Sequence, residues 1–377
     1  MSKYIDQLLT EVVQKEGSDL LLHEGAPPMM RIHGDLTRTG YRVLEDSAAV
    51  DAVAFPSCSD ALIQRFQEEW ELDFAYMIEG LARFRVNFMR QRGSTACTYR
   101  AIPFRIPTMQ ELSLPAVCTF MSERPRGLVL VTGPTGCGKS TTLAAMVNHV
   151  NEKFPLHIMT IEDPIEFVHT DKRAIVNQRM LGVDTRSFQE ALKRVLRQDP
   201  DVILVGEMRD LDTVSLAITA AETGHLVFAT LHTTDAVQTI DRIIDVFPTY
   251  QQQQIRMQLA VNLIGVVSQS LLKRVDGRGR VAAFEVLVAT SPIRNLIREA
   301  KTHQLASAIE TGTKQGMQLL DQALAALVRE GHVTYQDAAE KTSRPTEFDH
   351  ILYGDESRPE EPPPGVVGPP QLGGQQR

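Results

Sequence analysis

The sequence lacks the features that mark several common protein classes. Its four cysteines are scattered and form no Cys-x-x-Cys pair, which argues against structural zinc and a disulfide framework. The formal net charge of −8 supplies no basic footprint for nucleic acid. No apolar run approaches the roughly 20 residues of a membrane span, and the N-terminus lacks a signal peptide's apolar core. We therefore expect no nucleic-acid partner, no membrane span and an intracellular location.

The composition is that of a globular protein with more than one domain. The 377 residues are 43% hydrophobic and 23% charged, and a chain of this length usually divides in two. The first part, residues 1–102, mixes helical and alternating patterns, which predicts a small α+β domain. Helices are expected at 4–13 and 60–69, and strands at 20–23, 29–33, 72–76, 83–88 and 95–102. Residues 103–115 carry three prolines and are predicted to be a linker.

Residues 116–353 read as an α/β domain. Apolar strand-like runs alternate with helical segments, which predicts a mostly parallel sheet with helices on both faces. The expected strands are 128–132, 157–161, 202–205 and 226–231. From about Asp235 onward the pattern is mainly helical, with one strand-like stretch at 280–288. The tail, residues 354–377, is rich in proline and glycine and has no aromatic residue, so we expect it to be disordered.

A phosphate-binding loop follows the first of these strands. Residues 133–140 read Gly-Pro-Thr-Gly-Cys-Gly-Lys-Ser, which matches the pattern G-x-x-x-x-G-K-[ST] between a strand and a helix. The glycines let backbone N–H groups converge on an anion at the N-terminus of the helix. Lys139 is expected to neutralise the β- and γ-phosphates of ATP, and Ser140 to bind Mg²⁺. The predicted nucleotide-binding residues are Gly133, Pro134, Thr135, Gly136, Cys137, Gly138, Lys139, Ser140 and Thr141, with Cys137 as a small filler or a thiol whose modification blocks ATP.

Acidic residues follow two of the other strands. Glu162 ends the run at 157–161 and Glu207 follows the run at 202–205, which places both at the edge of the sheet where ligands bind. Phosphoryl transfer to water needs an acid beside Mg²⁺ and a group that orients the water. Glu207 suits the metal role and Glu162 the water-orienting role. Sequence alone leaves these two roles exchangeable, and a solvated loop carboxylate is the alternative for each.

Two histidines frame the strand at 226–231. His225 and His232 are seven residues apart, so on a continuous strand they face opposite sides, which argues against a shared metal. His232 lies at the carboxyl end of the strand, where it is expected to contact the γ-phosphate. For His225, a histidine satisfied within the core is an open alternative.

Four segments resemble the secretion and pilus ATPase superfamily, and most closely the retraction ATPases of type IV pili. They are the phosphate loop at 133–141 (Walker A), TIEDPIEF at 160–167 (Asp box), LVGEMRD at 204–210 (Walker B) and AETGHLVFATLHT at 221–233 (His box). The resemblance covers residues 1–350. It implies a PAS-like N-terminal domain and a RecA-like C-terminal domain, assembled as a homohexameric ring.

The resemblance also implies roles for individual residues. Glu162 becomes the catalytic base, Glu207 the Walker B acid near Mg²⁺, and His232 a neighbour of the γ-phosphate. Arg83 and Arg85 resemble the family's arginine-finger region, which would complete a neighbouring subunit's site; an exposed basic strand is the alternative.

The retraction ATPases carry the C-terminal motif AIRNLIRE, which reads Ser-Pro-Ile-Arg-Asn-Leu-Ile-Arg-Glu at 291–299 of this chain. Proline replaces the first alanine, which is tolerable if Ser291 is the N-cap and Pro292 the first helical residue. Ile293, Leu296 and Ile297 are expected to form an apolar stripe, and Arg294 and Arg298 to share an adjoining face.

The predicted function is therefore a Mg²⁺-dependent hexameric ATPase that retracts type IV pili and drives twitching motility. The resemblance implies an inner-membrane platform protein as partner, a position at the cytoplasmic face of that membrane, and a paralogous retraction ATPase as a further candidate partner. The alternatives are an accessory retraction ATPase of the PilU type, a pilus-assembly or type II secretion ATPase, a regulator without turnover, and a DNA-translocating relative. The missing tetracysteine module disfavours the assembly and secretion ATPases.

Overall fold

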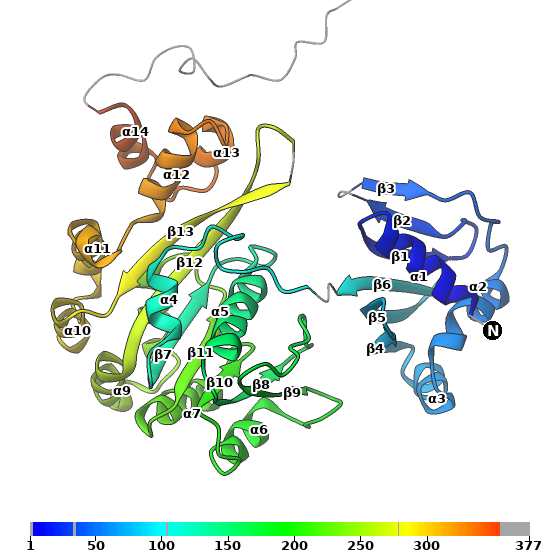
Figure 1. Ribbon diagram of the computed structural model, residues 1–377, viewed down its shortest axis with the longest axis horizontal. Helices are drawn as coiled ribbons and strands as arrows, with labels where there is room; N and C mark the ends of the chain where they lie inside the picture. Colours follow the sequence, from blue (N-terminus) through cyan, green and yellow to red (C-terminus); the bar gives the residue numbers. More distant parts are fainter. Residues whose placement is uncertain (1–2, 33–34, 103–104, 278, 355–377) are drawn as a thin grey trace, which may run out of the picture. The chain divides into compact units, whose positions relative to one another are not determined.

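A computed structural model describes residues 3–32, 35–102, 105–277 and 279–354. By its contacts the chain divides into two units, Met1–Arg105 and Ile106–Arg377, so the division falls inside the predicted linker (Figure 1). Met109 and Leu114 pack against the core of the second unit. The domain limits at 102, 115 and 353 remain predictions. The tail predicted to be disordered, residues 354–377, lies outside the described residues except for Gly354, as does the end of the predicted strand at His33.

The first unit is an antiparallel sheet covered on one face by helices. The first element of this unit is helix α1 (Tyr4–Gln14). It forms a helix because its apolar residues recur at helical spacing, and these residues are buried against the sheet. The strands run in the order β3-β2-β1-β6-β5-β4. Their bounds are β1 (Gly17–His23), β2 (Met29–Ile32), β3 (Asp35–Arg38), β4 (Glu71–Ile78), β5 (Ala82–Gln91) and β6 (Ser94–Ile102).

Three short helices complete the first unit: α2 (Ser47–Ala54), the 3₁₀ helix η1 (Phe55–Ser57) and α3 (Asp60–Glu69), in the described part of the chain. Sequence reasoning predicted α3 with its bounds but missed α2 and β3. Helix α2 is short, and all of β3 is exposed, so β3 has no apolar alternation to reveal it. In β5 the alternation is clear, because Phe84, Val86 and Phe88 are buried while Arg85 is exposed on the other face.

The second unit is built on a sheet in the order β13-β12-β7-β11-β10-β8-β9. All neighbouring strands are parallel except the antiparallel pair β12–β13. The central strands β7, β10 and β11 are fully buried and almost entirely apolar, because helices cover both of their faces. The strand bounds are β7 (Gly127–Thr132), β8 (His157–Glu162), β9 (Ile175–Met180), β10 (Val202–Val205), β11 (Leu226–Leu231), β12 (Leu263–Lys273) and β13 (Arg280–Val288).

Helices cover this sheet on both faces, as predicted. One face packs against α4 (Val117–Ser122) and α5 (Lys139–Lys153). The other packs against α6 (Phe188–Val195), α7 (Leu211–Glu222), α8 (Ala236–Asp245) and α9 (Thr249–Asn262). None of the helices in the described ranges combines the length and the apolarity that crossing a membrane requires.

The prediction of one strand after Asp235 was wrong, because β12 pairs with both β7 and β13. β12 follows α9 directly, and its long apolar run is compatible with a continued helix, so periodicity alone could not separate the two. Strand β9 was missed because it lies at the edge of the sheet and half of its residues are polar.

The described part of the second unit ends in a series of helices, some of which pack beside β12 and β13. Their bounds are α10 (Ser291–Arg298), η2 (Thr302–Gln304), α11 (Leu305–Thr311), η3 (Thr313–Gln315), α12 (Leu320–Arg329), α13 (Tyr335–Ala339) and α14 (Pro345–Tyr353). Helices α12, α13 and α14 form a small apolar core of their own with Leu272 of β12 and Ala283 of β13 (Figure 1).

The segment resembling AIRNLIRE forms α10, with one correction. Its N-cap is Thr290 rather than Ser291, which is the first helical residue. Ile293 and Ile297 are fully buried, as the apolar stripe requires. Arg294 reaches back to the end of α9, where its guanidinium donates to the carbonyls of residues 260, 261 and 263. The carbonyls of residues 260 and 261 lie in the last turn of α9 and have no partner within that helix, and Leu263 is its C-cap, so Arg294 fastens α10 to the C-terminus of α9.

Candidate active site

The phosphate loop connects β7 to α5 and needs glycine at several positions. Gly133, Gly136 and Gly138 have φ values of 138°, 78° and 94°, a region that other residues rarely adopt. At Gly133 a Cβ would overlap the carbonyl oxygen of Gln269, and at Gly138 it would lie 2.9 Å from the Gln269 side-chain nitrogen. The backbone conformation therefore favours glycine at all three positions, and at Gly133 the space requires it as well.

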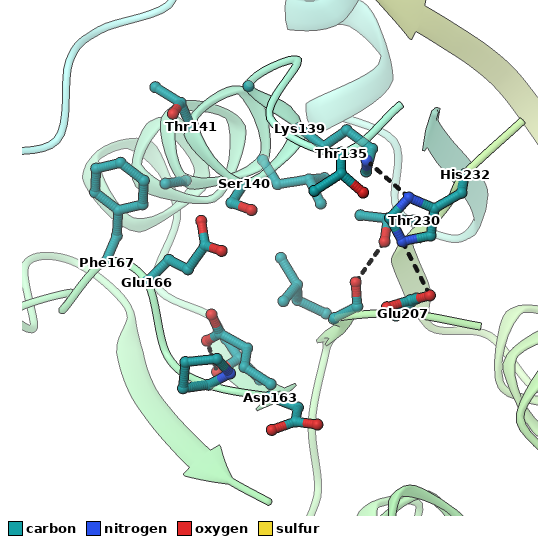
Figure 2. Close-up of a pocket in the computed structure, with 18 of the residues that line it drawn as sticks. Thr135, Lys139, Ser140, Thr141, Asp163, Glu166, Phe167, Glu207, Thr230 and His232 are labelled. Carbon is teal, nitrogen blue, oxygen red and sulfur yellow. Dashed lines mark hydrogen bonds and ion pairs between the residues drawn. The ribbon is translucent and has the colours of Figure 1, made fainter. Parts of the chain in front are cut away.

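A cavity of about 430 Å³ opens at the carboxyl ends of the strands. Among the predicted residues its lining includes Thr135, Gly136, Gly138, Lys139, Ser140, Thr141, Glu162, Glu207 and His232. Gly133, Pro134 and Cys137 belong to the loop but are outside the lining that the structure describes. Figure 2 shows side chains of α5 on one side of this cavity and Glu207 and His232 on the other. The fold thus gathers in one place residues that are up to 97 positions apart in the sequence.

Lys139 is buried at the rim of the cavity. Its ammonium donates to the carbonyls of Gly133 at 2.7 Å and Pro134 at 3.1 Å, and lies 3.5 Å from Nδ1 of His232. The chain therefore holds a fixed positive charge where the N–H groups of the loop converge. That arrangement suits a bound polyphosphate.

Glu207 lies between His232 and Arg209. Its Oε1 is 3.0 Å from Nε2 of His232, and its Oε2 is 2.7 Å from the Arg209 guanidinium (Figure 2). Burial raises the pKa of Glu207, but the hydrogen bond from Arg209 and the charge of His232 outweigh it, so this pKa is below its usual range. Glu207 is therefore held as a carboxylate, the form that a cation needs.

Glu162 has the opposite environment. It is the last residue of β8, and its Oε1 accepts hydrogen bonds from Thr160 at 2.6 Å and from Gln178 at 3.1 Å. Burial raises the pKa of Glu162 above its usual range despite these two bonds. A carboxyl group with a raised pKa is the better proton acceptor, and the pKa values of Glu162 and Glu207, which the sequence does not distinguish, are shifted in opposite directions.

Gln269 is a site residue that sequence reasoning missed. It is buried on β12, where its Oε1 accepts from the Thr142 hydroxyl at 2.8 Å and its amide donates to the carbonyl of Cys137. It therefore fastens the phosphate loop and the first turn of α5 to the sheet. The available signal was a polar residue inside an apolar run, but that run was not predicted to be a strand. The lining also includes His169 and Arg280, neither of which belongs to a motif that we identified.

The remaining candidates are not among the residues of the described lining. His225 precedes β11 at its amino end, where Nδ1 lies 2.9 Å from the carbonyl of Ala220. Burial raises the pKa of the Cys137 thiol, which keeps it protonated and favours the role of a filler. Arg83 and Arg85 belong to β5 of the first unit, whereas every residue of the described lining belongs to the second.

A parallel sheet with a phosphate loop, a buried lysine and two acids at the strand ends defines the nucleotide site of a P-loop ATPase. Residues 1–340 match the family model of type II/IV secretion system proteins. Because that match spans most of the chain, the protein belongs to this family, and it is an ATPase.

Within this family, the chain is similar to ATPases of type IV pili. The chain is 50% identical over 344 residues to the type IV pilus retraction ATPase PilT of Pseudomonas aeruginosa, covering 91% of this chain and 99% of that protein. It is 42% identical over 333 residues to the type IV pilus ATPase PilU of the same organism, covering 88% and 87%. A crystal structure of the pilus retraction motor PilT with bound ADP superposes with a TM-score of 0.85 at 44% identity, covering 92% of this chain and 99% of that one.

Proposed function

We propose that this chain is the ATP-hydrolysing motor that retracts a type IV pilus. One observation carries the proposal: half of the residues are identical to PilT over 91% of this chain and nearly the whole of that protein. The cavity supports it, because Lys139, Ser140, Glu162 and Glu207 are all present at its lining. In a regulator that does not turn over ATP, there would be no reason to place two acids in such different environments, one that raises the pKa of Glu162 and one that lowers the pKa of Glu207.

Each cavity residue has a role in this proposal. The loop N–H groups and Lys139 bind the β- and γ-phosphates of ATP. Ser140 and Glu207 offer the oxygen ligands that Mg²⁺ prefers, so the residues present fit that ion. Bound Mg²⁺ supplies charge neutralisation on the phosphates. Glu162 orients the attacking water and accepts its proton, and His232 contacts the γ-phosphate by hydrogen bonding.

Assembly is the second part of the proposal. The first unit would be a PAS-like domain, the second a RecA-like domain, and six chains would form a ring. Arg83 and Arg85 would complete the site of a neighbouring subunit, which would couple hydrolysis to the geometry of the ring. Hydrolysis would rotate the two domains about the linker. At the cytoplasmic face of the inner membrane the ring would act on a platform protein of the pilus machine.

An accessory role of the PilU type is the second candidate. It is supported by the 42% identity to PilU over 88% of this chain. Both the identity and the share of the chain covered are lower than for PilT. A secretion role has weaker support, since a type II secretion protein of Pseudomonas aeruginosa shares 37% identity over only 48% of this chain.

A gene deletion distinguishes these candidates. The deleted strain is complemented with the wild-type gene or with Glu207→Ala, and piliation and twitching are scored. Hyperpiliated, non-twitching cells rescued only by the wild type are expected for the retraction motor. Bald cells would mean assembly, and near-normal twitching in the deleted strain would mean an accessory role.

A further inference from the structure

A buried glutamate joins two helices that belong to different parts of the second unit. Glu285 lies on β13 and is 5% exposed. Its Oε1 accepts the backbone N–H of Ala236 at 2.7 Å, and its Oε2 accepts the N–H of Leu320 at 3.3 Å. Ala236 is the first residue of α8, and Leu320 is the first residue of α12. One carboxylate therefore holds the N-termini of both helices.

The first of these helices follows the loop that carries His232. Residues 233–235 are all that separate His232 from Ala236, and Asp235 caps α8 by accepting the N–H of Gln238 at 2.8 Å. The position of the first turn of α8 therefore fixes the end of the His232 loop. The second helix, α12, is part of the C-terminal core with α13 and α14. Glu285 is thus the direct connection between the His232 loop and that core.

A chain of buried hydroxyls supports the same connection. Thr132 of β7, Ser268 of β12 and Glu285 of β13 occupy one row across the sheet. The Ser268 hydroxyl lies 2.7 Å from that of Thr132, which directly precedes the phosphate loop. Thr132 also lies 3.5 Å from the hydroxyl of Thr239 in α8, which in turn is 2.7 Å from the hydroxyl of Thr233. Buried hydroxyls therefore join the phosphate loop to the His232 loop and to α8, and Glu285 lies beside them as the cross-strand neighbour of Ser268.

We propose that Glu285 is a positioning residue that couples the His232 loop to α12, so that nucleotide state at the cavity is transmitted to the C-terminal helices. The proposal rests on the proposed contact of His232 with the γ-phosphate. Movement of the His232 loop shifts the N-terminus of α8, and the shared carboxylate carries that shift to the N-terminus of α12. A helix N-terminus also favours a negative charge, so a carboxylate is the side chain best suited to hold two of them.

The environment of Glu285 raises its pKa into the neutral range. Burial and the charge of Asp235 raise the pKa of Glu285 to about 7, while the two backbone N–H groups and Arg344 oppose that rise. Arg344 is itself held at 2.8 Å by Asp321 in the first turn of α12. Glutamine at position 285 would have the same shape but only one oxygen, so it would leave one of the two N–H groups unpaired. Glu285→Gln thus removes the connection with little change in volume.

Asp321 provides a matched control. It is also buried, lies in the first turn of α12, and its carboxylate is bound to Thr342 at 2.6 Å and to Arg344. None of these described contacts involves the His232 loop. Asp321→Asn therefore disturbs the same helix with the same chemical change, but leaves the connection through Glu285 in place.

The experiment compares full-length wild type, Glu285→Gln, Asp321→Asn and His232→Ala. Steady-state ATP hydrolysis gives kcat and KM, and hydrogen exchange with and without the non-hydrolysable analogue AMP-PNP reports on residues 232–240 and 318–329. We expect Glu285→Gln to lower kcat about tenfold or more with KM changed less than about threefold, because binding is retained and the response is lost. AMP-PNP should protect both segments in the wild type and in Asp321→Asn, but only residues 232–240 in Glu285→Gln.

Several outcomes would overturn the coupling. If Asp321→Asn behaves like Glu285→Gln, the effect is a general loosening of α12. If AMP-PNP changes exchange at 232–240 but not at 318–329 in the wild type, there is no transmission; this arm needs no variant to fold. If His232→Ala lowers kcat but Glu285→Gln does not, the coupling through Glu285 is rejected while the contact of His232 with the γ-phosphate stands. A fully active His232→Ala instead rejects the γ-phosphate contact, and the coupling with it.

Discussion

The sheet of the first unit leaves one face open, whereas helices cover the sheet of the second unit on both faces. The open face carries charged side chains, among them Arg85 of β5, which lies opposite Arg100 of β6. The central strands of the covered sheet carry no charged residue and are fully buried. The cavity of the second unit therefore lies at the carboxyl ends of the strands, while the first unit carries charged side chains along a whole face.

This difference separates two kinds of functional residue. Lys139, Glu162 and Glu207 are positioned by the covered sheet within a single chain. Arg83 and Arg85 are presented by the open sheet, and their proposed role needs a second chain. Substitutions in the two sheets should therefore fail in different ways, and the predictions below run from the largest expected effect to the smallest.

Lys139→Ala should have the largest effect. Removing the ammonium takes away the main positive charge at the phosphate loop, so we expect loss of both ATP binding and hydrolysis, by about 10³-fold or more in kcat/KM. Fluorescent-nucleotide titration and a phosphate-release assay measure the two losses. Lys153→Ala is the control, because Lys153 lies at the far end of α5 and pairs with Glu123. If Lys139→Ala bound ATP with unchanged affinity, the phosphate loop would not be part of the nucleotide site.

Glu162→Gln should abolish turnover while preserving binding. The amide has the shape of the carboxyl group but cannot accept a proton, so kcat should fall by about 10² to 10⁴-fold at nearly unchanged ATP affinity. Gln178→Ala sharpens this test, because it removes one hydrogen bond to Glu162 without touching the carboxyl group. It should lower kcat by a smaller factor. Normal turnover in Glu162→Gln would refute its role as the base.

Arg83→Ala tests the open sheet. A single chain should bind ATP normally, because the described lining of the cavity contains no residue of the first unit. Hydrolysis that depends on assembly should fall at least about tenfold, as for other arginines that act across subunits. The assay is ATP turnover as a function of protein concentration. Arg38→Ala, on the exposed strand β3, is the control. Equal turnover in both variants would make Arg83 an ordinary surface residue.

The sequence predicted most of what the two sheets build but not how the covered sheet is completed. Alternation in β5 and the apolar runs of β7, β10 and β11 give strong signals because burial on one face or on both leaves a simple pattern. β12 has such a run too, but it continues the helical segment before it. Because β12 was not predicted, the role of Gln269 was missed as well, since that role depends on which strand lies beneath the phosphate loop.

The states of Glu162 and Glu207 could not be predicted for a related reason. Both are glutamates at strand ends, and the sequence shows no difference between them. The difference comes from neighbours that the fold supplies: Thr160 and Gln178 at one, and Arg209 and His232 at the other. His232 was chosen over His225 because it lies at the carboxyl end of its strand, and the structure places only His232 in the described lining.

The pH dependence of stability should reveal the cost of a buried acid in the covered sheet. The pKa of Glu285 is raised to about 7, above its unfolded value, so its contribution to stability is fully present below pH 4.5 and is lost as pH rises through 7. Relative to Glu285→Gln, the wild type should therefore lose about 3 kcal/mol of unfolding free energy between pH 4.5 and pH 8. Urea unfolding across this range measures the difference, and a constant difference would contradict the raised pKa.

Asp19→Asn should give the smallest effect, because it tests a buried acid on the open sheet. Asp19 is 5% exposed, but its partners are the surface arginines Arg100 at 2.8 Å and Arg31 at 3.7 Å, whose side chains are 64% and 39% exposed. Water screens these pairs, so we expect a loss of about 1 kcal/mol in unfolding free energy. The loss should shrink in high salt, as it would not for Glu285, whose partners are backbone N–H groups within the core. A larger loss that is insensitive to salt would mean that the open face of the first unit is covered by another chain in the working assembly. The two sheets would then differ in that one forms an interface and the other forms a core.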